Sequence, residues 1–281
     1  MKRAIAAAVW ILVSAVGAAS VFGHQGVGSL FDLGSSARGL GLGGAFTALV
    51  DDEGAVLHNP AGLGWRTNIG ISSLYVSQFG GIDYGSIGVA LPYAGLNVAL
   101  LDSGLIPTTG GVTRYASQGV VASSGIALGP IGLGARWRLL RVSAPEAGAG
   151  WSIDPAVQLV TNVVRAGAIF EGALSRAMTY AGGSQEAWPQ SLRLGVSVTL
   201  SPVSDVSWSA AFEAVGLFTG LPGLAAGLEA WIGGMGARAG YDGEGLTYGL
   251  SVAFPGLQFD WAYASRADLG ESHRVSLSIR F

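Results

Sequence analysis

The last nine residues of the chain, His273–Phe281 (HRVSLSIRF), alternate between two kinds of side chain. Val275, Leu277, Ile279 and Phe281 share one side of an extended chain, and serines and arginines share the other. A helix would scatter these apolar residues around its surface, whereas a strand places them on one face. The end of the chain is therefore predicted to be a β-strand with one apolar and one polar face.

The same alternation recurs through most of the chain, for example in Leu192–Leu200, Val206–Phe212, Leu246–Phe254 and Leu257–Tyr263. It predicts about 14 strands, an even number as in bacterial outer-membrane barrels. The expected spans are 67–77, 82–91, 94–102, 117–128, 131–141, 151–160, 163–173, 191–200, 205–214, 223–232, 234–241, 246–254, 257–265 and 273–281.

The lengths of the connections support a membrane barrel. Every second connection is short, as in Pro92-Tyr93 and Pro255-Gly256, whereas most of the others are longer, as in Ser103–Ala116, Val142–Gly150 and Leu174–Gln190. Bacterial barrels have short periplasmic turns and longer outer loops. The pattern therefore predicts an all-β fold, a transmembrane antiparallel β-barrel with both termini on the periplasmic side.

The composition agrees with this fold class. Only 12% of the 281 residues are charged, and half are apolar. A soluble protein of this kind would expose large apolar patches, whereas a barrel turns that surface towards lipid. We therefore expect the cell outer membrane as the location and its lipid as a partner. A net charge of −3 gives no indication of nucleic-acid binding, and the lack of cysteine excludes disulfides and thiolate metal sites.

The N-terminus has the pattern of a secretory signal. Lys2 and Arg3 precede an apolar run, Ala4–Phe22, and small residues favour cleavage after Gly23 or near Ala19. The alternative is an uncleaved anchor, because the run approaches the ~18-residue lower limit of a membrane span. We expect cleavage, since small residues weaken the second half of the run.

One long stretch does not alternate. Arg38–Gly64 (RGLGLGGAFTALVDDEGAVLHNPAGLG) is rich in glycine and contains three adjacent carboxylates, Asp51, Asp52 and Glu53. The glycine run lacks the Lys-Ser/Thr of a phosphate loop. The carboxylates could bind a divalent cation, but their order is not that of a calcium loop. We expect a solvated turn or pairing with arginines inside the barrel, and no metal.

The end of that stretch predicts a rigid corner. Proline fixes φ in Asn59-Pro60, asparagine readily caps a turn, and Gly62 permits close approach of another backbone. The alternative is an ordinary surface turn.

Two blocks of sequence carry a resemblance to a known family. Arg38–Ala45, Asp51-Asp52 and Asn59–Leu63 resemble the N-terminal signature of PorV/PorQ-type outer-membrane proteins, within the wider group of FadL-like transporters. Phe259–Tyr263 and Leu269–Leu277 resemble the last hairpin of the same group. The sequence departs from the family pattern at Glu53-Gly54 and at His58, which precedes Asn-Pro where an aromatic residue is usual.

The resemblance implies a barrel whose N-terminal segment folds into the lumen as a plug. The expected organisation is a signal peptide in 1–23, a plug in 24–66 and the barrel in 67–281. The expected plug motif consists of Gly41, Gly43, Gly44, Asp51, Asp52, Asn59, Pro60 and Gly62.

Charged residues on the polar faces of the strands are expected to line the lumen, because a lipid-facing arginine costs ~2–4 kcal/mol at the bilayer midplane. Neighbouring strands could pair Arg193 with Glu213, or Glu229 with Arg238. A structural ladder is the preferred interpretation, and a selectivity lining is the alternative. The predicted lining residues are Arg136, Arg138, Arg165, Arg193, Glu213, Glu229, Arg238, Asp260 and Arg274.

Three single positions lead to further hypotheses. A last strand that ends in Phe281 resembles the signal read by the barrel assembly machinery, which is therefore an expected partner. Pro155 could mark an opening in the wall, or a simple bulge, because proline removes a ladder hydrogen bond. Trp231, with other aromatic residues near strand ends, is expected in a girdle at the membrane surface.

The expected function follows from the fold and the resemblance. The chain has no G-x-S-x-G or H-E-x-x-H motif, so we expect no enzyme and no cofactor. Uptake or passage of small hydrophobic compounds is the leading hypothesis. The alternatives are a PorV-like partner or shuttle in type IX secretion, which would bind secretion components, and a structural barrel. A continuous apolar tunnel would favour transport, and a sealed lumen with a partner-facing outer surface would favour secretion.

Overall fold

A computed structural model of the chain describes residues 27–78, 81–219, 222–266 and 270–281, so the predicted signal peptide lies outside the described residues. The strands are β1 (Gly70–Gln78), β2 (Ile82–Leu91), β3 (Ala94–Asp102), β4 (Ile106–Thr108), β5 (Gly111–Thr113), β6 (Ala116–Leu128), β7 (Ile131–Ala144), β8 (Gly148–Val160), β9 (Val164–Glu171), β10 (Leu174–Tyr180), β11 (Gln185–Glu186), β12 (Ser191–Val203), β13 (Val206–Leu217), β14 (Gly223–Ile232), β15 (Met235–Tyr241), β16 (Leu246–Phe254), β17 (Leu257–Arg266) and β18 (Gly270–Arg280).

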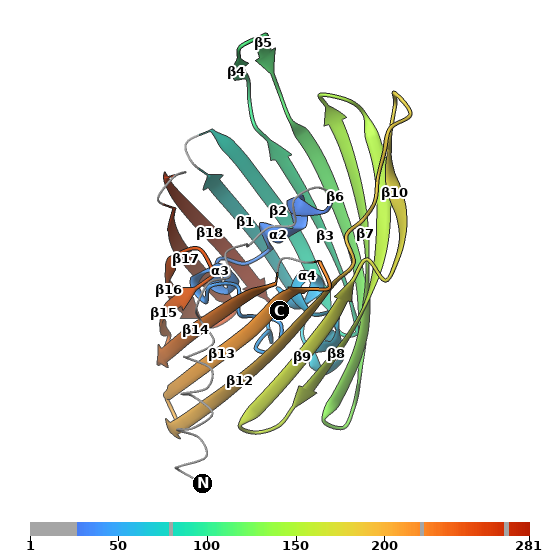
Figure 1. The fold of residues 1–281 in the computed structure, drawn as a ribbon. Coiled ribbons are helices and arrows are strands. Elements are labelled where there is room, and N and C mark those ends of the chain that lie inside the picture. Colours follow the sequence, from blue (N-terminus) through green and yellow to red (C-terminus); the bar gives the residue numbers. More distant parts are fainter. Residues whose placement is uncertain (1–26, 79–80, 220–221, 267–269) are drawn as a thin grey trace.

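These strands form a closed antiparallel barrel (Figure 1). Each strand of the ring pairs with its neighbour in the sequence, and β18 returns to pair with β1. The 16-stranded sheet closes through the β8–β9 pair, which leaves β10 and β11 beyond the ring and 14 strands in the barrel. The predicted fold class and strand number are therefore confirmed.

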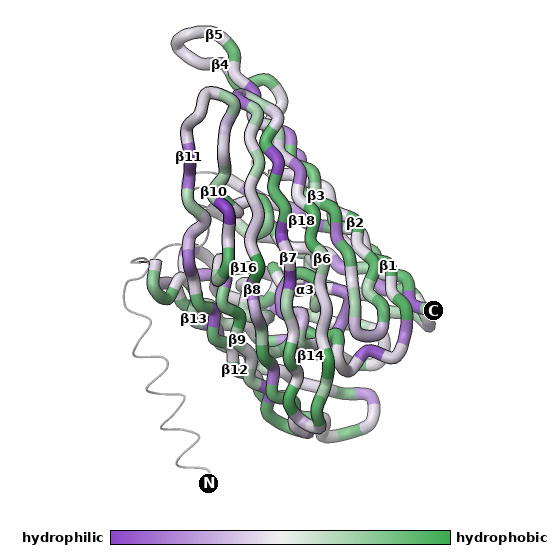
Figure 2. Tube along the Cα trace, turned by 90° about the vertical axis from the view of Figure 1, so that its right-hand side faces the viewer, coloured by the Kyte–Doolittle hydropathy of each residue, from purple (hydrophilic) through white to green (hydrophobic). Residues whose placement is uncertain are grey.

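The two faces of the strands are those expected from the alternation. In β18, Leu277 and Ile279 are 39% and 38% exposed on the outside, whereas Ser276 and Ser278 are 3% and 7% exposed on the inside. Figure 2 shows the same mixture of hydrophobic and hydrophilic residues along the other strands. Trp231 is an exception to the predicted girdle, because its ring lies 5.1 Å from the Arg238 guanidinium, which points into the barrel.

The two ends of the barrel differ. One end carries Phe281 and the short turns and is called the short-turn end. At the opposite, loop end, β6, β7, β8 and β10 rise above β12 to β16 (Figure 1). Two predicted loops were therefore too long. Val142–Gly150 shrinks to 145–147 because β7 and β8 extend into it, and Leu174–Gln190 contains β10 and β11.

Residues 27–66 lie inside the barrel and form α2 (Ser29–Asp32), α3 (Ala37–Gly41), α4 (Ala55–His58) and the 3-10 helix η1 (Pro60–Trp65). Their contacts reach strands around the ring: η1 packs on β6, β7 and β8, and α3 packs on β15 to β18. Within the described residues, no helix combines the length and apolar character needed to cross a membrane.

Glycines of the wall make room for this inner segment. A Cβ atom at each of ten inward-facing wall positions would lie 3.2 Å or less from an atom of residues 41–61. At all of them except Gly195 and Gly249 that distance is under 3.0 Å, so the inner segment approaches the wall more closely than a side chain would allow without a shift. This contact involves ten of the 46 glycines of the chain. The ten positions are Gly70, Gly95, Gly125, Gly132, Gly134, Gly167, Gly195, Gly227, Gly240 and Gly249.

Candidate functional site in the barrel interior

Arg38 is the centre of the contacts between the inner segment and the wall. Ser36 caps α3 by accepting a hydrogen bond from the Arg38 backbone N–H at 3.1 Å, which orients the first turn. The Arg38 guanidinium donates two hydrogen bonds of 2.8 Å to the Glu229 carboxylate of β14. Its remaining terminal nitrogen contacts Asp51 at 2.7 Å and Asp52 at 3.0 Å. This forked contact ties two parts of the inner segment to one strand.

The Arg38 contact continues around the wall through neighbouring strands. Glu229 pairs with Arg238 of β15 at 2.5 Å, and these two residues are direct partners in the sheet. Arg238 also donates to Ser251 at 2.5 Å and lies 3.6 Å from Asp260. The structure thus brings together Arg38 and three of the predicted lining residues, Glu229, Arg238 and Asp260.

A second charged network lies on the neighbouring strands of the wall, from β7 to β13. Asp154 of β8 accepts a hydrogen bond from Arg136 at 2.7 Å and another from Arg138 at 3.2 Å. Arg193 of β12 contacts Glu171 at 3.2 Å, Glu213 at 3.6 Å and Asp32 of the inner segment at 3.1 Å. Arg136 also pairs with Glu171, which joins the two halves. Each buried arginine therefore faces carboxylates, the arrangement that buried charges require.

The three adjacent carboxylates of the inner segment are held by arginines. Asp51 contacts Arg165 of β9 at 3.0 Å, and Glu53 contacts Arg66 at 2.8 Å and Arg280 of β18 at 2.9 Å. The Arg38 and Arg165 guanidiniums hold the pKa of Asp51 below its usual value. The described residues contain no cluster of His, Asp and Glu suited to a metal ion.

The Asn59 corner is pinned to the wall at several points. Its side-chain oxygen accepts from the Ala61 N–H at 3.2 Å, and its amide nitrogen donates to the carbonyls of Thr47 at 2.9 Å and Val157 at 3.2 Å. Pro60 begins η1. A Cβ on Gly62 would lie 3.1 Å from the Gln158 side chain of β8, so the corner fits only with a small residue there.

The remaining predicted residues are three glycines of the inner segment, Arg274 of β18 and Phe281. Gly41 faces Gly249, and Gly43, with a φ of 66°, rests on the backbone of Tyr241. Gly44 also has a positive φ, 82°. Arg274 of β18 donates to the Leu33 carbonyl at 2.9 Å. At the short-turn end, the Phe281 ring is 74% exposed, and its backbone N–H donates to Ile69 at 2.9 Å.

His58 is buried as a neutral ring. Its imidazole meets the edge of the Phe46 ring at 5.1 Å, and its Nε2 atom has no hydrogen-bond partner among the described residues. Burial, reinforced by Arg193 and Arg136, lowers the pKa of His58 to about 3. The side chain therefore occupies the aromatic position of the family pattern as an uncharged ring.

Replacing His58 with phenylalanine is expected to flatten the acid sensitivity of the fold. Below pH 6.5 the unfolded chain binds a proton that folded His58 does not accept until about pH 3. Each pH unit in that window therefore costs the wild type up to ~1.4 kcal/mol. Urea unfolding in detergent at pH 7.5 and 5 measures the difference, and an equal loss of stability in both proteins would contradict it.

The wall is interrupted beside Pro155. Pairing of β8 with β7 is continuous through Pro155. On the other side of β8, pairing with β9 ends at Ala156–Ile169, and pairing with β10 begins at Ile153–Leu174 with the register shifted by two residues. The gap is bridged by Gly172, whose N–H donates to Asp154 at 2.7 Å. The structure therefore places a break in the strand pairing at Pro155, which the hydrogen bond from Gly172 to Asp154 crosses.

Two aromatic residues that sequence reasoning missed lie at the loop end of the interior. Trp188, from the segment between β11 and β12, is 4% exposed and stacks on Phe31 with 6.3 Å between ring centres. Phe31 also borders a cavity of about 30 Å³ that includes His58 and Arg193. Such a space holds about one water molecule.

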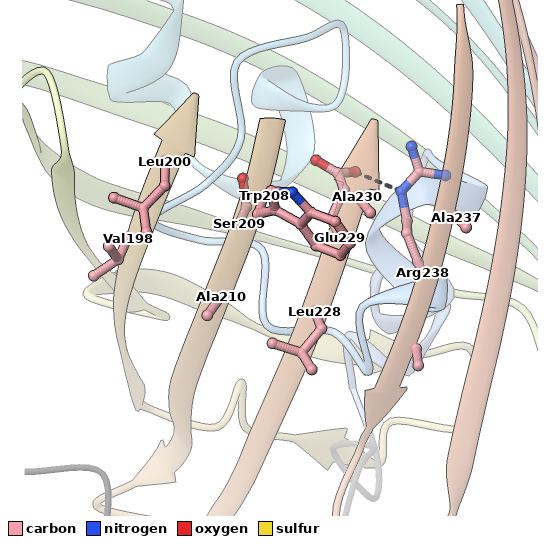
Figure 3. Close-up of a pocket in the computed structure, with 11 residues that line it drawn as sticks. Val198, Leu200, Trp208, Ser209, Ala210, Leu228, Glu229, Ala230, Ala237 and Arg238 are labelled. Carbon is pink, nitrogen blue, oxygen red and sulfur yellow. Dashed lines mark hydrogen bonds and ion pairs between the residues drawn. The ribbon is translucent and has the colours of Figure 1, made fainter. Parts of the chain in front are cut away.

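The outer wall has a shallow groove on its lipid-facing side. Val198, Leu200, Trp208 and Leu228 border a space of about 400 Å³ whose floor is formed by alanines, while Glu229 and Arg238 pair on the inner side (Figure 3). The groove is part of the apolar surface that the strands present to lipid.

The fold is similar to that of FadL-like hydrocarbon transporters. The CymD monoaromatic hydrocarbon channel aligns with a TM-score of 0.57 at 15% identity over 88% of this chain and 97% of that chain. The Pseudomonas putida toluene transporter TodX aligns with a TM-score of 0.55 at 14% identity over 93% and 98% of the two chains. The Ralstonia pickettii toluene transporter TbuX gives 0.52 at 13% identity over 88% and 98%. No protein-family model and no curated protein sequence matches the chain.

Proposed function

We propose that the protein is an outer-membrane channel for the uptake of small hydrophobic compounds, with residues 24–66 as its plug. The observation that carries the proposal is the combination of a lipid-facing barrel with an inner segment clamped across its lumen. The likeness of this barrel to hydrocarbon channels supports the choice of substrate class.

The inner segment fills the interior through both apolar contacts and ion pairs. Near the loop end the inner segment packs through Val27, Leu30 and Phe31 in a cluster that includes Leu140 and Met178. Ion pairs also hold the segment along its length, from Asp32 with Arg193 to Glu53 with Arg66 and Arg280. An apolar compound would therefore need the plug to move before it could leave on the periplasmic side.

Uptake into proteoliposomes tests the function. Vesicles that contain the protein are expected to take up labelled toluene faster than protein-free vesicles, and to exclude a polar solute of similar size. Toluene crosses lipid unaided, so the experiment requires rapid mixing and bilayers with lipopolysaccharide in the outer leaflet. Equal rates with and without the protein would contradict the proposed function.

The finer likeness to PorV/PorQ-type proteins rests on the sequence blocks around Gly43, Asn59 and Trp261. Its support is that the first two positions lie where the inner segment touches the wall. A role with secretion components belongs to this finer proposal. Recognition of Phe281 by the barrel assembly machinery is likewise proposed, supported by the exposure of its ring at the short-turn end.

A further inference from the structure

We propose that the slot now filled by the Phe31 ring is the binding site for a single-ring aromatic compound, and that Phe31 occupies it when no compound is bound. The proposal rests on the proposed function and names its ligand class and place. Phe31 belongs to α2, the most N-terminal of the described helices, and its side chain is 5% exposed.

Three different surfaces shape the slot to an aromatic ring. The Trp188 indole stacks on Phe31 at 26° between the ring planes. The Arg138 guanidinium carbon lies 5.5 Å from the centre of the Phe31 ring and 5.0 Å from that of Trp188. On the wall, a Cβ at Gly119 would lie only 2.6 Å from the Phe31 ring, so bare backbone forms that side.

The Arg138 guanidinium gives the slot a preference for aromatic over saturated rings. A guanidinium is attracted to the negative face of a π system, and a saturated ring has no such face. Arg138 is held in place by Ser152 at 3.0 Å and Asp154 at 2.7 Å, so its charge stays beside the slot whatever fills it. Toluene should therefore bind better than methylcyclohexane, although the two are similar in size.

The Phe31 ring belongs to a short helix, which the ion pair of Asp32 with Arg193 at 3.1 Å holds against the wall. The helix α2 has only four residues and is flanked by Gly28 and Gly34, with φ values of 101° and 81°. Ser29 is exposed. The Trp188 indole N–H has no hydrogen-bond partner in the described part of the chain, so contacts of its ring hold it. An arriving ring could displace Phe31 without breaking the ion pairs of Arg138.

Fluorine NMR in nanodiscs tests the displacement directly. We introduce 4-fluorophenylalanine at position 31 or, as a matched control, at position 46, where the buried ring also lies beside an arginine, with 5.4 Å from its centre to Arg38. Saturating toluene is expected to move the resonance of the ring at 31 towards its value in the urea-unfolded chain. The resonance at 46 should stay in place, and methylcyclohexane should have a much smaller effect.

A second variant gives the affinity. Phe31→Ala should bind toluene roughly tenfold more tightly than the wild type, as for a slot that is open about a tenth of the time. If toluene is bound or taken up while the ring at 31 stays buried, the slot proposal is wrong and the proposed function stands. If methylcyclohexane displaces the ring equally, the aromatic preference is wrong. If the protein neither binds nor transports toluene, both proposals fail.

Discussion

Replacing Gly134 with alanine is expected to force η1 away from the wall and to destabilise the barrel by about 2–3 kcal/mol, the cost of overpacking a tight core. Gly134 and Gly125 are partners on neighbouring strands and together form the seat for Pro60 and Ala61. A Cβ at Gly134 would lie 2.6 Å from the Pro60 carbonyl carbon and 2.8 Å from the Ala61 Cα. These are backbone atoms, so a rotamer change cannot relieve the clash.

Gly85→Ala is the matched control for this effect. Gly85 also lies within a strand, but the nearest atom to its added Cβ is the Leu74 carbonyl oxygen at 4.0 Å. Its free energy of unfolding should change by no more than about 0.5 kcal/mol. Urea unfolding of both variants, with limited proteolysis of residues 27–66, measures the difference. Equal stability and equal protease resistance of the two variants would show that the inner segment does not depend on this seat.

Arg38→Met is expected to lower the free energy of unfolding by roughly 3–5 kcal/mol, as for breaking a buried ion pair by removing one partner. The substitution removes the two hydrogen bonds to Glu229 and the contacts with Asp51 and Asp52. Glu229 would keep only its ion pair with Arg238, and Asp52 would lose its ion pair with the Arg38 guanidinium. Arg38→Lys should restore only part of the lost stability, because the lysine ammonium cannot make the two parallel hydrogen bonds of the planar guanidinium.

Arg165→Met separates this effect from a general loss of positive charge. The Arg165 side chain is 24% exposed and its partner Asp51 is 45% exposed, so the pair is screened by solvent. Its loss should cost less than about 1 kcal/mol. The two variants can be compared by urea unfolding and by single-channel conductance, where a displaced plug should leave Arg38→Met leaky to ions. A similar small cost in both would contradict the role of Arg38 as the central clamp.

The sequence predicted the barrel well because a strand repeats every two residues regardless of its tertiary partners. The same alternation placed the charged residues on the inner face, and it pointed to Arg193–Glu213 and Glu229–Arg238 as pairs. Asp154 could have been found in this way, since it shares a face with Ser152 and Gln158.

The interior was harder to predict. Helices of four or five residues are too short for a hydrophobic period, and α2, α3 and α4 are stabilised by the wall rather than by local propensity. Nothing in the local pattern around Trp188 indicates that this side chain turns into the lumen. The sequence showed a high glycine content. It could not show which residues of the inner segment each wall glycine contacts, because those contacts form only when the barrel closes.

Locking the inner segment to the wall tests most directly whether it is a plug that must move. The chain has no cysteine, and a Cβ at Gly195 of β12 would lie 3.2 Å from the Ala48 Cβ, close to the roughly 3.5–4.5 Å found in disulfides. The double variant Ala48→Cys/Gly195→Cys should therefore form a cross-link on oxidation. If the inner segment must move for uptake, toluene uptake into proteoliposomes should stop on oxidation and return on reduction. Unchanged uptake with the disulfide formed would contradict the claim that the segment is a moving plug.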